Sequence, residues 1–117
     1  WFDVYYFYTG KQKLEQEQYL DAIPYFSKLS DRAISLYNIG NTFLEYGLTL
    51  AWEQQKKAYV QSLLMYELSL QQEEDESTRK NYEYVKSLLE LWDNQEKQKQ
   101  DEAIKRGEFE KILQEKM

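Results

Sequence analysis

Few residues in this chain could do chemistry, and the most suggestive are two asparagines, Asn38 and Asn41. They stand three positions apart, so in a helix they would share one face. Asparagine is a poor helix former, and its carboxamide can both donate to and accept from an extended peptide backbone. The pair therefore indicates recognition of a polypeptide. The alternative is a local role, in which Asn38 satisfies the adjoining inter-helix loop.

The side chains that most enzymes rely on are missing from the sequence. The 117 residues include no histidine and no cysteine, which excludes thiolate nucleophiles, histidine-assisted catalysis and nearly all zinc or iron ligation. Catalysis by carboxylates alone would need paired acids in a desolvated pocket. The glutamates here occur in runs that are typical of solvent-facing surfaces. We therefore predict no catalytic activity, no metal and no cofactor.

Two short segments resemble ligand sites but lack essential parts. The string Thr9-Gly10-Lys11 has no upstream glycine of the kind that a phosphate-binding loop requires. The acidic run 73–76 lacks the spaced ligands and the glycine of a calcium loop. The 15 basic residues are dispersed among 21 acidic ones, with a net charge of −6, which argues against a nucleic-acid surface. We expect neither a nucleic acid nor a small-molecule substrate.

The elements that must position any binding residues are helices. The chain has one proline and four glycines, too few turn residues for a sheet protein, so an all-α fold is predicted. Apolar runs such as Tyr5 to Tyr8 are far too short to span a bilayer. The chain starts at Trp1 instead of methionine, so we expect a fragment of a longer protein. A targeting or membrane segment could precede it.

An internal repeat supplies the plan of the fold. Gly10 and Gly40 each follow an aromatic or apolar residue by four positions. Further along, one set of residues matches a second set spacing for spacing: Tyr19, Ala22, Ile23 and Phe26 match Tyr59, Ser62, Leu63 and Tyr66. A glycine inside a helix costs about 1 kcal/mol relative to alanine, so its recurrence predicts a tight crossing of paired helices. We expect two helical hairpins, with Ala22 and Ser62 facing the two glycines.

The two hairpins differ in length. Twelve positions separate Gly10 from Ala22, whereas twenty-two separate Gly40 from Ser62. The additional ten lie around 48–57, after Gly47, which suits a helix C-cap, and 51–72 is expected to form one long helix. Leu48, Leu50 and Trp52 are expected to pack against a third helical pattern that begins near Ser77, or else to form an exposed apolar patch together.

Two features of the sequence indicate where helices begin. Ser30 or Asp31 can cap the helix that follows. Pro24 fits a helix that begins near Leu20 or Asp21, where the proline would lie in the first turn; a kink is expected otherwise.

A third helical pattern begins near Ser77, after an acidic and polar break. Its apolar stripe consists of Tyr82, Val85, Leu89 and Trp92, and its outer face is charged, as expected of a helix that closes a repeat stack. From residue 93 to 117 the chain is rich in lysine, glutamate and glutamine. We expect a helical tail there, either solvated or leaning on a neighbour.

Several strings resemble a known family. The segment 36–42 looks like the first helix of a tetratricopeptide repeat (TPR), and 19–26 looks like the second helix of the preceding repeat. More narrowly, three features resemble the Bat-type (aerotolerance) repeat proteins associated with von Willebrand A-domain membrane proteins of bacteria. They are the string Tyr37-Asn38-Ile39-Gly40-Asn41, the lengthened second repeat, and 79–86 after an acidic linker.

The resemblance covers roughly residues 5–91 and implies a domain organisation. A TPR-like domain would occupy 1–92, with repeat 1 at about 3–29 and repeat 2 at about 32–72, the latter with an insertion at about 48–57. A capping helix would follow at about 77–92, and a charged helical tail would occupy 93–117.

The same resemblance implies a concave groove lined by the first helix of each repeat. The residues that would face a partner are Phe7, Lys11, Leu14, Tyr37, Asn38, Asn41, Leu44, Glu45 and Tyr84, with Val4 and Asn81 beside them. Clamps for chaperone C-termini use a lysine and an asparagine where this chain has Phe7 and Lys11, so that ligand is not expected.

The expected function is a scaffold that binds a peptide or helix of a partner protein, within a bacterial envelope assembly. The alternative is a homo-oligomer built through the open repeat end and the C-terminal helix. The sequence does not fix the location. The resemblance implies the periplasm or the cell envelope, with the full-length protein anchored in a membrane.

Overall fold

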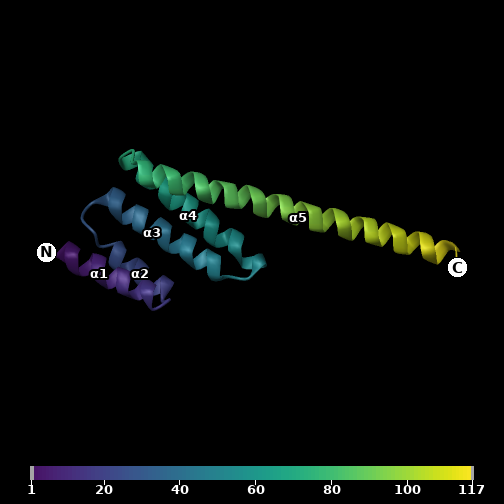
Figure 1. The fold of residues 1–117 in the computed structure, drawn as a ribbon, viewed down its shortest axis with the longest axis horizontal. Coiled ribbons are helices and arrows are strands. Elements are labelled where there is room, and N and C mark those ends of the chain that lie inside the picture. The colour runs from purple at the N-terminus through teal and green to yellow at the C-terminus, as the bar shows by residue number, and fades with distance from the viewer. Residues whose placement is uncertain (1, 117) are drawn as a thin grey trace.

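The computed structural model describes residues 2–116, which form five helices joined by short links (Figure 1). Their bounds are α1 Phe2–Glu15, α2 Tyr19–Phe26, α3 Arg32–Thr49, α4 Trp52–Gln72 and α5 Glu76–Lys116. The described part of the chain contains no strand, so the all-α prediction is confirmed. No helix within residues 2–116 is both long and apolar enough to cross a membrane.

The helices pack mainly on their neighbours in sequence, which gives an elongated arrangement (Figure 1). Helix α1 turns back into α2 through residues 16–18, and α3 turns back into α4 through Leu50 and Ala51. Glu17 has a φ of 59°, the left-handed conformation that commonly ends a helix. Asp31 caps α3, because its side chain accepts from the Ile34 backbone N–H at 3.1 Å, as expected from the sequence.

Gly10 and Gly40 are equivalent contact points in the two helix pairs. A Cβ on Gly10 would lie 2.6 Å from Cε1 of Phe26, and a Cβ on Gly40 would lie 2.6 Å from Cε1 of Tyr66. The expected close crossings are therefore present. The rings of Phe26 and Tyr66, one turn beyond Ala22 and Ser62, lie closest to where the two Cβ atoms would be. Ser62 also faces its glycine as expected, because it donates its hydroxyl hydrogen to the Gly40 carbonyl at 2.8 Å.

Gly47 is a third contact of the same kind, so its prediction as a C-cap is wrong. It lies inside α3 and is buried, and a Cβ there would approach Cε1 of Tyr59 to 2.7 Å. Gly40 and Gly47 are seven residues apart, as are Tyr66 and Tyr59 on the antiparallel α4. The added residues of this pair therefore extend α3 and α4 by further helical turns, joined by a two-residue link.

The placement of Pro24 also differs from the expectation. Helix α2 begins at Tyr19, so Pro24 is its sixth residue and lies beyond the first turn. The helix ends two residues later, at Phe26. A proline in this position removes only one intrahelical hydrogen bond, and the early end of α2 keeps that disruption small.

The core consists of two clusters that follow the two helix pairs. One contains Ala22, Phe26 and Ile39, between α1, α2 and α3. The other contains Tyr59, Tyr66 and Val85, between α3, α4 and α5. Two fully or nearly fully buried tyrosines explain part of the unusual tyrosine content, because their rings fill the spaces that the glycines leave.

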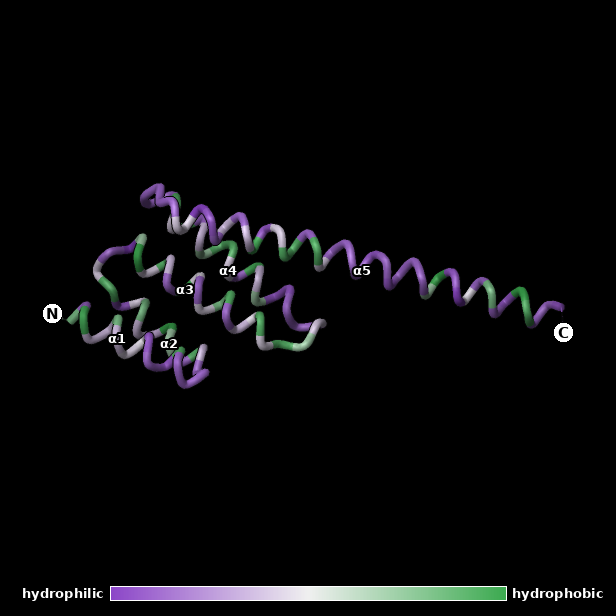
Figure 2. The backbone as a smooth tube through the Cα atoms, in the orientation of Figure 1, coloured by the Kyte–Doolittle hydropathy of each residue, from purple (hydrophilic) through white to green (hydrophobic). Residues whose placement is uncertain are grey.

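Helix α5 is continuous from Glu76 to Lys116, so the expected capping helix and tail are one element. Its first half packs on α4, and from Lys97 to Lys116 every residue is exposed. Figures 1 and 2 show this second half projecting from the other helices, mostly hydrophilic with separated hydrophobic positions. At 1.5 Å per residue the 41-residue helix is about 60 Å long, which accounts for most of the 76 Å extent of the molecule.

Two tryptophans hold α5 to the start of α4. Trp52 and Trp92 stack with ring centroids 5.1 Å apart and an interplanar angle of 12°. The indole N–H of Trp92 donates to the Trp52 carbonyl at 2.8 Å, and that of Trp52 donates to the Glu96 carboxylate at 3.1 Å. The packing expected against this helix is confirmed for Trp52, whereas it is wrong for Leu48, which is 52% exposed.

Candidate partner-binding groove

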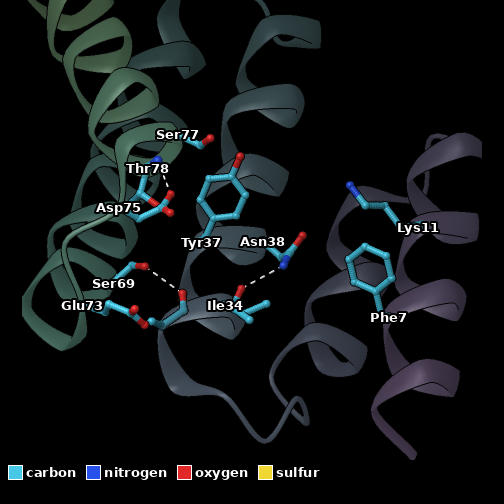
Figure 3. A pocket seen from close by; sticks show the side chains of 11 residues that line it. Phe7, Lys11, Ile34, Tyr37, Asn38, Ser69, Glu73, Asp75, Ser77 and Thr78 are labelled. Atoms are coloured by element: carbon cyan, nitrogen blue, oxygen red, sulfur yellow. Dashed lines mark hydrogen bonds between the residues drawn. The ribbon is translucent and has the colours of Figure 1, made fainter. Parts of the chain in front are cut away.

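A surface groove of about 510 Å³ lies between α1 and the junction of α4 and α5, with α3 as its floor (Figure 3). Its lining comes from three separate parts of the chain. Helix α1 contributes Phe7 and Lys11; α3 contributes Ala33, Ile34, Tyr37 and Asn38; and the α4–α5 junction contributes Ser69, Glu73, Asp75, Ser77 and Thr78. We call this feature the groove.

The floor is apolar and aromatic. Ile34 stands one turn before Asn38 on α3 and is 50% exposed. Tyr37 lies further along the floor, and its ring centroid is 6.2 Å from that of buried Tyr66. The cap at Asp31 fixes the start of α3, so it also fixes the phase that points these side chains into the groove.

The wall on α1 carries a cation above an aromatic ring. Lys11 Nζ lies 5.5 Å from the centroid of the Phe7 ring, within the range of a cation–π attraction. The Phe7 ring in turn contacts Phe26, with centroids 6.4 Å apart. This wall therefore packs on the first core cluster at its base and is positively charged at its rim.

The opposite wall is acidic. Four consecutive acidic residues, Glu73, Glu74, Asp75 and Glu76, form what we call the acidic lip. Asp75 caps α5 by accepting from the Thr78 backbone N–H at 3.0 Å. Glu74 pairs with Arg79 at 2.8 Å, and the hydrogen bond from this guanidinium lowers the pKa of the Glu74 carboxyl. Of the acidic lip, Glu73 and Asp75 line the groove, so the groove separates one lysine from two carboxylates.

The two asparagines have different surroundings. Asn38 lines the groove but is only 5% exposed, and its amide donates to the Ile34 carbonyl at 2.8 Å. Asn41 is half-buried, and its carbonyl oxygen accepts from the Tyr66 hydroxyl and from the Asn81 amide, the latter at 3.0 Å. Both carboxamides are thus engaged within the chain, as in the local alternative. The partner of Asn38 is its own helix, not the adjoining loop.

The hydrogen bonds around Asn41 also satisfy a buried phenol. Tyr66 has no exposed surface, and burial raises the pKa of its hydroxyl well above the usual value. Its hydroxyl donates to Asn41, so this buried polar group has a hydrogen-bond partner. Asn81 also reaches the Tyr37 hydroxyl, at 3.5 Å. This network connects α3, α4 and α5 behind the groove.

The remaining predicted residues lie outside the groove lining. Leu14 packs against the first core cluster and Leu44 against the second. Glu45 is exposed, and Val4 and Tyr84 are 54% and 50% exposed. The structure thus brings together four of the nine predicted residues: Phe7, Lys11, Tyr37 and Asn38.

Sequence reasoning missed the rest of the lining. Ile34 lies three residues before Tyr37, so its helical phase could have identified it. The acidic lip is visible in the sequence as a run of carboxylates, a pattern typical of a solvated linker. Its position beside α3 depends on how α4 ends and α5 begins.

Comparison of the chain with models of protein families, with curated proteins and with solved structures gives no significant match.

Proposed function

We propose that this protein is an interaction module that holds a segment of a partner protein in the groove. One observation carries the proposal: an apolar floor around half-exposed Ile34 lies open between a lysine and the acidic lip. Exposed apolar surface rimmed by polar residues marks interaction sites. The walls of opposite charge would fix the direction of a bound segment, because its basic end would face the lip and its acidic end would face Lys11.

The finer fold assignment belongs to the same proposal. Two helix pairs with equivalent glycine–aromatic contacts, stacked in chain order, support a TPR-like arrangement of two repeats closed by α5. In such an arrangement the first helices of the repeats, here α1 and α3, would line the concave side. On the resemblance to Bat-type proteins, we extend the proposal to an assembly at the bacterial envelope.

The proposal is tested by selecting ligands from a displayed library of random 15-residue peptides and measuring their affinity by calorimetry. Ile34→Glu places a charge on the floor and should weaken binding on the order of tenfold or more. Val60→Glu is the matched control, because Val60 is 43% exposed on α4 and does not line the groove. Equal affinity for the two variants would refute binding in the groove.

A further inference from the structure

The projecting half of α5, residues 97–116, carries a stripe of apolar side chains. Phe109, Ile112 and Leu113 stand at positions i, i+3 and i+4, so they lie on one face. They are 61%, 51% and 46% exposed, and Ile104 nearby is 60% exposed. We call residues 97–116 the tail. Large aliphatic and aromatic side chains held in water along one helix face indicate a surface that binds another chain.

The tail cannot occupy the groove of its own molecule. Thr78, in the first turn of α5, lines the groove, and Phe109 lies 31 residues further along the same continuous helix. That separation corresponds to roughly 45 Å of helix. The stacked tryptophans hold α5 along α4, and Figure 1 shows the tail directed away from the rest of the molecule. Any groove that the tail fills must therefore belong to another molecule.

Charge favours an encounter between the tail and the rest of a second molecule. The tail carries six basic and five acidic residues, whereas the remainder of the chain carries nine basic and sixteen acidic. The basic pair Lys105 and Arg106 lies about one turn before Phe109. A helix bound with Phe109 on the groove floor can therefore bring this pair toward the acidic lip. The stripe would meet exposed Ile34 and half-buried Tyr37 on the floor.

We infer that the groove binds the tail of a second copy of this chain. The inference rests on the proposed function, since it names the occupant of the same groove. Because the groove and the tail are different surfaces at opposite ends of the molecule, the contact is heterologous, and repetition of it produces open chains or closed rings.

The test mixes two variants of the full chain, each lacking one of the two surfaces. Ile34→Glu disables the groove and keeps the tail; Phe109→Glu disables the tail and keeps the groove. Wild-type protein should form concentration-dependent oligomers in light scattering, and each variant alone should be monomeric. Their mixture retains one working groove and one working tail, so it should form 1:1 dimers and nothing larger. Gln114→Glu, on the opposite side of the tail from Ile112, should associate like wild type.

Two outcomes would overturn the inference. Oligomers of the Ile34→Glu variant alone would show that the tails pair with each other or with another surface. A wild-type chain that stays monomeric at millimolar concentration would show that the tail is not the occupant. Selected peptides that still bind wild type and not Ile34→Glu would preserve the proposed function in either case. Circular dichroism of all variants should match wild type, since Ile34 and Phe109 are exposed.

Discussion

The same substitution, glycine to alanine, should have opposite effects at Gly40 and Gly107. Both glycines lie inside helices, α3 and α5 respectively. At Gly40 a Cβ would lie 2.6 Å from Cε1 and 2.7 Å from Cδ1 of Tyr66. That ring is fully buried and its hydroxyl is bonded to Asn41, so it has little freedom to move. At Gly107 a Cβ would meet nothing within 4 Å among the described residues.

The magnitudes follow from two terms. Alanine gains about 1 kcal/mol of helix propensity over glycine. Forcing a methyl group into a packed core costs about 1–3 kcal/mol, and the fixed ring at Gly40 places this site at the upper end. Gly40→Ala should therefore lower the free energy of unfolding by about 2 kcal/mol. Gly107→Ala should stabilise the tail helix by about 1 kcal/mol, with little effect on global unfolding because the tail opens locally.

Urea denaturation followed by circular dichroism measures the first effect, and amide hydrogen exchange in the tail measures the second. Exchange around residue 107 should slow about fivefold, the factor that corresponds to 1 kcal/mol. If Gly40→Ala instead stabilised the protein, the close contact between α3 and α4 would not exist. The equivalence of the two helix pairs would then lose its main support.

Three further perturbations test other contacts. Trp92→Ala removes the stack on Trp52 and should cost about 2 kcal/mol, roughly half the value for a buried tryptophan; urea unfolding and loss of near-ultraviolet dichroism would report it. Burial raises the folded-state pKa of Tyr66 above its usual 10. The contribution of the neutral hydroxyl to the free energy of unfolding is therefore complete below pH 10 and is lost as the pH rises further. Between pH 8 and pH 11, the Tyr66→Phe variant should lose less free energy of unfolding than the wild type. Hydrogen bonds from Ser30 lower the pKa of Asp3. Their contribution to stability is therefore present above about pH 4 and is lost on acidification. Asp3→Asn should lower the melting temperature at pH 7, and the difference in melting temperature between variant and wild type should vanish near pH 2.

Much of the fold could be predicted because the signals are local and repeated. The recurrence of glycine at one phase of two helices predicted the crossings, since only a close contact offsets the cost of glycine in a helix. Spacing alone did not show which residue opposes each glycine. Positions one turn apart on the facing helix share a phase, so Phe26 and Tyr66 were indistinguishable from the small residues before them.

Glycines near an apparent helix end are ambiguous in sequence. Gly47 suits a C-cap as well as a tight crossing, and only the approach of Tyr59 decides between them. That approach depends on the length of α4 before Tyr59. The sequence shows how many residues of α4 precede Tyr59, but it does not show the register of α4 against α3.

The groove was predictable on the side built by helical phase. Phe7, Lys11, Tyr37 and Asn38 follow from the groove that the repeat resemblance implies together with the phase of two helices, whereas the acidic lip reaches the groove only through the packing of α4 and α5. The same limit applies to Asn41, whose partner Asn81 lies forty residues away. A hydrogen bond between helices so distant in sequence leaves no local pattern.

The most direct test of the central claim is a residue-resolved nuclear magnetic resonance titration of the full chain with a selected peptide. We predict that amide shifts concentrate at Phe7, Lys11, Ile34 and Tyr37 and at the acidic lip, and that residues around Val60 stay unchanged. Shifts centred elsewhere, with the groove residues unmoved at saturation, would contradict the account.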